Sequence, residues 1–194
     1  MRPHRELPAF LVCACLTALS PSVVPAQAPP SRPPATPASE TTMTDVPHLQ
    51  ASANLAQLMQ AIIFPNSNVI FFAQDKDPAN VKHAEKASLS TDPLAGTFGG
   101  WAAVENSSLT LAEAANLLTI PGRVCSNGRT VPVNDTDWLK FVQALRAAGL
   151  TSYKAAQSKS NDQMLDAADA VIRACSNCHN RYRDKPGGLA GRCM

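Results

Sequence analysis

Between about residues 46 and 183, apolar residues recur at intervals of three and four, which is the period of a helix with one buried face. The first such stretch predicts a helix over about 46–64, begun by Asp45 and Pro47 and interrupted by Pro65, with a short apolar run continuing past the kink. Its recurring apolar positions are Leu55, Leu58, Met59, Ile62 and Ile63.

A second helical stretch begins near residues 98–103, and Thr110 with Glu113 forms a capping-box pattern ahead of its most regular part. The stretch is expected to end at Gly122. A turn-rich connection of residues 123–134 follows, with the pattern of a small hairpin.

Two further helices complete the pattern. Asp135 is expected to cap the third helix, which is predicted to bend at Gly149, and Ser160 with Gln163 forms a capping box at the start of the fourth. The fourth helix is predicted to present Leu165, Ala168, Ile172, Cys175, His179 and Tyr182 on one face. Four amphipathic helices with hardly any strand pattern predict an all-α fold, a helical bundle.

The first residues follow a different pattern. A basic start, a short apolar stretch and small residues near Ala26 predict a secretory signal over residues 1–26 rather than a membrane span, which places the mature protein in the periplasm. The alternative is a lipoprotein signal with Cys15 acylated, which would anchor the protein to a membrane.

The segment that follows the signal, residues 27–45, is rich in proline and is predicted to be a disordered linker. No later apolar run is expected to reach membrane-spanning length, so residues 46–194 are predicted to form one soluble domain. Seventeen Lys and Arg are balanced by fifteen Asp and Glu without long runs of one sign, which argues against nucleic acid as a partner.

The most specific motif is Cys175-Ser176-Asn177-Cys178-His179, the attachment signature of c-type haem. On a helix these Cys and His positions share a face, so two thiols can bond the two vinyl groups of one haem while the imidazole reaches the iron. Export supports the same interpretation, because haem is attached covalently on the far side of the bacterial inner membrane.

Three other readings of the motif are weaker. A thioredoxin-type pair lies at a helix N-terminus after a strand, whereas this pair lies late in a helix. A zinc site needs further ligands, and Cys125, Cys193, His48 and His83 are scattered along the chain. A disulfide between the two motif thiols would leave the adjacent His without a role.

The longer motif Cys-x-x-Cys-His-x-x-Tyr-Arg, from Cys175 to Arg183, stands near the end of a chain with four predicted helices. In these features the chain resembles the cytochrome c prime family, also called class II cytochromes c, over roughly residues 46–183. The resemblance implies an antiparallel four-helix bundle with one covalent haem c held between the helices, near the C-terminal one. It also implies Cys175 and Cys178 as attachment points and His179 as the proximal ligand.

In that family the first helix faces the sixth iron position. Members with Met there are low-spin and mainly carry electrons, whereas members with an apolar residue bind nitric oxide or carbon monoxide. The pair Leu58-Met59 resembles the low-spin pattern, so Met59 is expected to be the second axial ligand. The alternatives are a vacant site with Met59 as core packing, or ligation by His48 or His83.

The resemblance assigns further residues and an assembly. Arg183, in preference to Arg181, is expected to reach a haem propionate, and Tyr182 to pack on haem or on a neighbouring helix. Family dimers pack through the first two helices, so a homodimer is implied, although this chain departs from the pattern there at Pro65 and in the polar loop of about residues 74–97. The inserted connection before the third helix is another departure.

Cysteine usage adds one inference. Of the six Cys, two lie in the signal and two in the motif, which leaves Cys125 and Cys193. In an oxidising compartment this even remainder predicts a disulfide, with free or intermolecular thiols as the alternatives.

Together these features predict a periplasmic electron carrier whose partner is another redox protein or a dehydrogenase. The alternatives are a protein that binds a small gas ligand, and a haem subunit tethered to a dehydrogenase by the proline-rich linker. Because the sequence lacks a Ser-His-Asp order, paired carboxylates and a phosphate loop, we expect no enzymatic activity of its own.

Overall fold

The computed structural model describes residues 48–183 and residue 193. Within these residues the regular elements are helices, and the predicted hairpin is reduced to one isolated bridge between Val124 and Thr130. The predicted signal and linker, residues 1–26 and 27–45, lie outside the described part of the chain.

The first helical segment is one continuous run of three elements: α1 (Leu55–Leu58), a π-helix (Met59–Ile63) and α2 (Phe64–Asp75). It begins nine residues later than predicted, since residues 48–54 are not helical. Asn54 is the cap: its Oδ1 accepts from the Gln57 N–H at 2.9 Å, and the Gln57 Oε1 accepts from the Asn54 N–H at 3.0 Å. This reciprocal pair satisfies two N–H groups at the start of α1. Asp45 and Pro47 lie outside the described residues.

Pro65 does not interrupt this segment, contrary to the prediction. It occupies the first turn of α2, directly after the π-helix. The Phe64 N–H donates to the Met59 carbonyl, five residues back instead of four. Proline offers no N–H and would crowd the carbonyl four residues before it, and the wider π turn accommodates both effects without ending the helix.

The prediction that no apolar run would reach membrane-spanning length was also wrong. In the described part of the chain, Leu55–Asp75 is long and apolar enough, by length and composition, to cross a bilayer. In this fold α2 instead packs on α3 and α5. Val69, Ile70 and Ala73 of α2 are buried there, as in the core helix of a bundle.

The second helix, α3 (Trp101–Leu117), runs without a break through the expected capping box. Thr110 therefore lies in the helix interior, where its hydroxyl donates to the Asn106 carbonyl at 2.8 Å. The prediction failed because a Thr inside a helix can bond back to the carbonyl four residues earlier, so its presence alone does not mark a helix start.

The third helix, α4 (Thr136–Ser158), begins where predicted, because the Asp135 side chain accepts from the Asp137 N–H at 2.8 Å. It continues uninterrupted through Gly149, which lies directly against α3. A Cβ at this position would stand 2.8 Å from the Ala112 backbone nitrogen and 2.9 Å from the Ser108 carbonyl oxygen. Gly149 therefore permits a close approach of two helix backbones.

The fourth helix, α5 (Asn161–Tyr182), has the predicted cap, since the Ser160 hydroxyl accepts from the Gln163 N–H at 3.3 Å. Its buried face differs from the prediction at two positions, because Leu165 and Ile172 are exposed. The buried positions are Met164, Ala167, Ala168, Val171 and Ala174. Alanines occupy most of this face, and their small side chains let α5 lie close to its neighbours.

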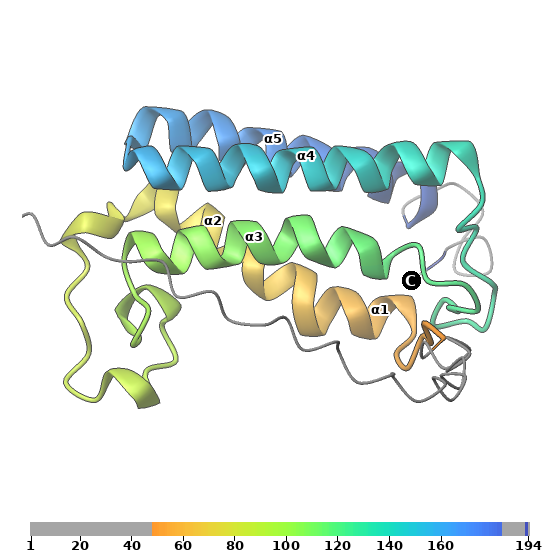
Figure 1. Ribbon diagram of the computed structural model, residues 1–194, viewed down its shortest axis with the longest axis horizontal. Helices are drawn as coiled ribbons and strands as arrows, with labels where there is room; N and C mark the ends of the chain where they lie inside the picture. The colour runs from red at the N-terminus through yellow and green to blue at the C-terminus, as the bar shows by residue number, and fades with distance from the viewer. Residues whose placement is uncertain (1–47, 184–192, 194) are drawn as a thin grey trace, which may run out of the picture. The chain divides into compact units, whose positions relative to one another are not determined.

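The four helical segments run alternately in opposite directions (Figure 1), so helices that follow one another in the sequence are antiparallel. α3 packs on both α2 and α4, and α5 packs on both α4 and α2. The predicted all-helical class is confirmed. One end of this arrangement brings together the start of α1, the ends of α3 and α5, the start of α4 and the connection 118–135.

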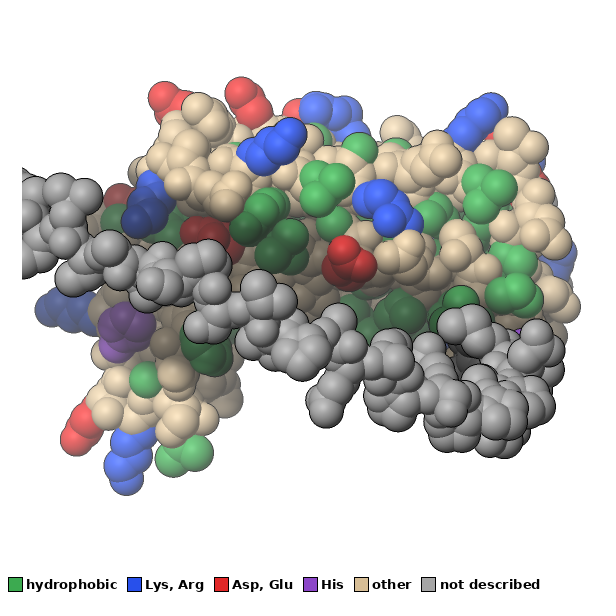
Figure 2. Space-filling model, in the orientation of Figure 1, with side chains coloured by type: hydrophobic (Ala, Val, Ile, Leu, Met, Phe, Trp, Pro, Cys, Tyr) green, Lys and Arg blue, Asp and Glu red, His purple; other side chains and the backbone are tan. Residues whose placement is uncertain are grey.

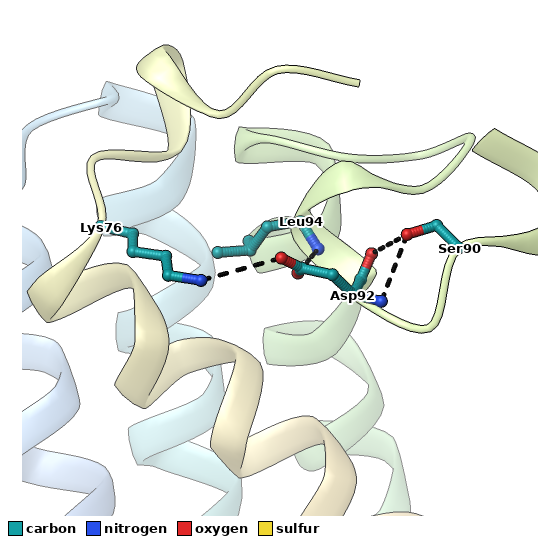
Figure 3. Close-up of polar contacts among 4 residues, drawn as sticks. All are labelled: Lys76, Ser90, Asp92 and Leu94. Atoms are coloured by element: carbon teal, nitrogen blue, oxygen red, sulfur yellow. Dashed lines mark hydrogen bonds and ion pairs between the residues drawn. The ribbon is translucent and has the colours of Figure 1, made fainter. Parts of the chain in front are cut away.

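The polar loop between α2 and α3 lies at the opposite end and is held by three short 3-10 turns, Pro78–Asn80, Ala87–Leu89 and Pro93–Ala95. Figure 3 shows how its last part is fixed. Asp92 accepts from the Leu94 N–H at 2.9 Å and pairs with Lys76 at 3.8 Å, at the end of α2. Leu94 is buried beneath the loop.

Candidate functional site

The motif residues Cys175, Cys178 and His179 lie in the last two turns of α5. Helical spacing places them on one face of the helix, and all three are half-buried. Both thiols are unbonded, so the alternative of a Cys175 to Cys178 disulfide does not occur.

All three side chains line a cavity of about 480 Å³ near this end of the bundle. This volume lies within the range of roughly 300–1,000 Å³ that is typical of small-molecule and cofactor sites. The walls are almost wholly apolar and come from α1, the π-helix, α2, α4 and α5. The remaining lining residues include Leu55, Met59, Ile63, Phe64, Phe71, Leu118, Trp138, Phe141, Val142, Leu145, Tyr182, Arg183 and Cys193.

Met59 lines this cavity together with His179, although the two residues are far apart in sequence. Met59 begins the π-helix, and the preceding Leu58 is buried in the core at 4 % exposure. Met59 itself is half-buried and packs at the edge of the core. The fold therefore brings the expected distal residue and the expected proximal residue to one apolar chamber.

The two alternative histidines lie elsewhere. His48 and His83 are both exposed, and neither lines the cavity. The His83 Nδ1 lies 3.1 Å from the Gly96 carbonyl oxygen, within the loop at the far end of the bundle. Of the candidates for a sixth ligand, Met59 is the one placed at the cavity.

Tyr182 packs on α4, which was one of its two expected positions. Its ring stands edge-on to Trp138 at 5.0 Å and to Phe141 at 6.0 Å between ring centroids. Trp138 is buried, and its indole N–H donates to the Leu118 carbonyl at 3.0 Å. The Tyr182 hydroxyl is buried and has no hydrogen-bond partner among the described residues. A polar atom of this kind beside a cavity indicates that a ligand or water completes its bonding.

The two arginines after the motif differ in position. The Arg181 Nε lies 3.9 Å from the Asp137 Oδ2 of α4, so Arg181 is directed toward the third helix. Arg183 lines the cavity. Its positive charge partly offsets the effect of burial on the pKa of the Cys175 thiol, which burial raises. Of the two arginines, Arg183 is therefore the one placed at the cavity, and its contact with a haem propionate stays a prediction.

The thiol pKa values disfavour a thioredoxin-type pair. Burial, followed by the neighbouring Cys175, raises the pKa of the Cys178 thiol to about 11. Catalytic redox cysteines have pKa values lowered by a helix N-terminus or a cation. The described residues contain no group of three or more His, Cys, Asp or Glu side chains that could hold a metal ion.

Aromatic residues of α2 were missed as part of the site. Phe64 and Phe71 both line the cavity, and Phe64 is 62 % exposed. For Phe71 the available signal was the apolar run after Pro65, but the assumed kink at Pro65 separated that run from the first helix. The exposed face of Phe64 is the kind of apolar surface that a cofactor in the cavity would cover.

The predicted disulfide between Cys125 and Cys193 is confirmed. It joins the connection between α3 and α4 to the C-terminal tail across 68 residues of sequence. Cys193 lines the cavity, and its N–H donates to the Tyr182 carbonyl at 2.9 Å, at the end of α5.

Removing this bond should lower the free energy of unfolding by about 2–4 kcal/mol, because it frees a long loop in the unfolded chain. Urea unfolding of the Cys125→Ala/Cys193→Ala protein measures the loss, and Cys193→Ala alone should lose a similar amount. A double variant within about 0.5 kcal/mol of the original protein would show that the bond adds no stability.

Comparisons with family models, with curated proteins and with solved structures find no match to this chain.

Proposed function

We propose that this chain is an exported mono-haem c-type cytochrome that carries electrons in the periplasm. One observation supports the proposal most: two unbonded thiols, a histidine and a methionine line the same apolar cavity, with the thiols and histidine at attachment spacing. Bound there, haem c would supply one-electron chemistry at its iron.

The residues present fit such a group. Cys175 and Cys178 would form the two thioether bonds, and His179 would ligate the iron from α5. Met59 would ligate it from the π-helix. The cavity is apolar apart from a few groups, and one of these is the buried Tyr182 hydroxyl without a partner. This hydroxyl and the Arg183 guanidinium are suitable donors for a propionate.

The surroundings of the cavity would tune the potential. Apolar walls exclude water and lower the local dielectric, which disfavours the extra positive charge of ferric iron. A thioether ligand acts in the same direction and raises the potential relative to a second histidine. Both effects favour a carrier that accepts electrons readily.

The proposed partner is a periplasmic redox protein or a dehydrogenase. Figure 2 shows acidic and basic side chains interspersed on the face in view, without a patch of one sign. Such a face gives weak electrostatic steering, so we expect association through it to depend only modestly on ionic strength.

A second candidate function is the binding of nitric oxide or carbon monoxide. The side chains near Met59 at the cavity, Ile63 and Phe64, are apolar and would surround a small neutral gas without offering a competing ligand. This function requires that Met59 is absent from the iron or easily displaced.

The test is to isolate the protein from a host that attaches haem and to extract it with acid-acetone. We expect haem to stay on the polypeptide because of the two thioether bonds, and the oxidised and reduced optical spectra to be those of low-spin, six-coordinate iron. Complete extraction of the haem would refute covalent attachment. A high-spin, five-coordinate spectrum would favour the gas-binding function.

A further inference from the structure

Arg123 is a buried cation in the connection between α3 and α4, with 3 % of its surface exposed. Its Nη1 donates to the Ala53 carbonyl at 2.5 Å. Its Nη2 and Nε both donate to the Leu117 carbonyl, at 2.9 and 3.2 Å. One guanidinium thus joins the last residue of α3 to the residue that precedes the Asn54 cap of α1.

The two residues after Arg123 extend this connection. The Val124 carbonyl accepts from the Leu55 N–H at 2.8 Å, at the first residue of α1. Cys125 is bonded to Cys193, whose N–H donates to the Tyr182 carbonyl at the end of α5. Three consecutive residues therefore link the start of the helix that carries Met59 to the end of the helix that carries His179.

The start of α1 needs such support. α1 is the first turn of the continuous helical segment and is followed directly by a π turn. The first N–H groups of a helix have no intrahelical partners, so bonds from other parts of the chain stabilise this end. Leu55 and Met59 lie one turn apart and both line the cavity. A shift of the Ala53–Leu55 backbone would therefore move Met59 relative to the cavity.

We propose that Arg123 is a positioning residue for the sixth iron ligand: by holding the Ala53 carbonyl against the end of α3, it fixes the first turn of α1 and keeps Met59 directed into the cavity. This inference rests on the proposed function. The planar guanidinium is suited to the task because it reaches two carbonyls at once in fixed directions, which an ammonium or an amide does less well.

The test uses the haem-loaded Arg123→Gln and Arg123→Lys proteins, with carbon monoxide as the probe of the ferrous iron. We expect Arg123→Gln to retain covalent haem and to have a larger high-spin fraction. Carbon monoxide should bind at least about tenfold faster, which corresponds to a tenfold smaller equilibrium constant for Met59 ligation. Arg123→Lys should restore part of the low-spin spectrum, because it keeps the charge and one donor.

Two controls separate positioning from general stability. Arg146→Gln removes an arginine that joins α4 to α3 through Asn116, a bond that does not involve the start of α1. It should leave the spectrum unchanged. In a Met59→Leu background, Arg123→Gln should change the carbon monoxide rate by less than about twofold, because the ligand that Arg123 positions is already absent.

Three outcomes would overturn the inference: a folded Arg123→Gln protein with the original spectrum and rate, an equal acceleration in the Met59→Leu background, or a five-coordinate original protein. Should Arg123→Gln not fold, Arg123→Lys and Asn54→Ala decide, since Asn54→Ala releases the same turn at its cap. If the original protein is haem-loaded and low-spin but these variants leave its spectrum and carbon monoxide rate unchanged, the inference about Arg123 is rejected and the proposed function stands. An original protein without covalent haem rejects the proposed function and this inference together.

Discussion

A protein that carries Cys175→Ala and Cys178→Ala should contain no haem that survives acid-acetone extraction. Each thiol supplies one of the two thioether bonds, so removing both leaves only coordination by His179 and Met59, which acid breaks. Haem staining of a denaturing gel and the mass of the intact polypeptide measure the result. Each single variant should keep one thioether bond and yield less holoprotein.

The matched control is Cys125→Ala/Cys193→Ala, which also removes two cysteines near the same end of the bundle but leaves the motif intact. It should be less stable and still carry covalent haem. Covalent haem in the Cys175→Ala/Cys178→Ala protein would show that attachment uses other residues. Loss of haem in both double variants would indicate a general effect of destabilisation rather than attachment through the motif.

Local signals predicted the existence and type of the helices, because the apolar period and several caps agree with the final fold. Asp135 and Ser160 begin α4 and α5 as expected, since their side chains bond the free N–H groups of the first turn whatever packs nearby. The Cys125 to Cys193 disulfide followed from counting cysteines.

Predictions failed where a local signal was overridden by tertiary packing. Asp45 was expected to start the first helix, but Asn54 caps it, and the Leu55 N–H donates to the Val124 carbonyl, 69 residues away. Pro65 looked like a break because an α-helix cannot accommodate it internally at low cost, yet a π turn can. Where the first helix starts, and whether it continues past Pro65, therefore depends on tertiary packing.

The helical period predicted the part of the site that lies on a single helix. Cys175, Cys178 and His179 share a face of one helix, so the sequence placed them together. Met59 was expected to face the bundle interior, and it lines the same cavity. The burial of Arg123 could not be predicted from the sequence, because a basic residue in a turn-rich connection normally lies in solvent. Its guanidinium is buried together with two carbonyls from other parts of the chain, to which it donates hydrogen bonds.

Substituting Met59→Leu should convert the haem-loaded protein from low-spin to high-spin while preserving the bundle. Leucine has nearly the volume and polarity of methionine, so the cost in stability should stay below about 1.5 kcal/mol. Leucine has no sulfur lone pair, so the sixth position would open. We expect the potential to fall, because a thioether ligand raises it, and carbon monoxide to bind the ferrous protein at least about tenfold faster. Optical spectra, redox titration and stopped-flow mixing measure these changes.

The matched control is Met164→Leu, the same substitution at a fully buried position of α5 that does not line the cavity. It should leave spectrum, potential and carbon monoxide rate unchanged, because Met164 contributes packing alone. An original protein that is low-spin and remains so after Met59→Leu would mean that another residue ligates the iron. An original protein that is already high-spin would mean that Met59 only packs in the cavity wall, and the apolar surroundings of Met59 would then serve a gas ligand rather than an electron carrier.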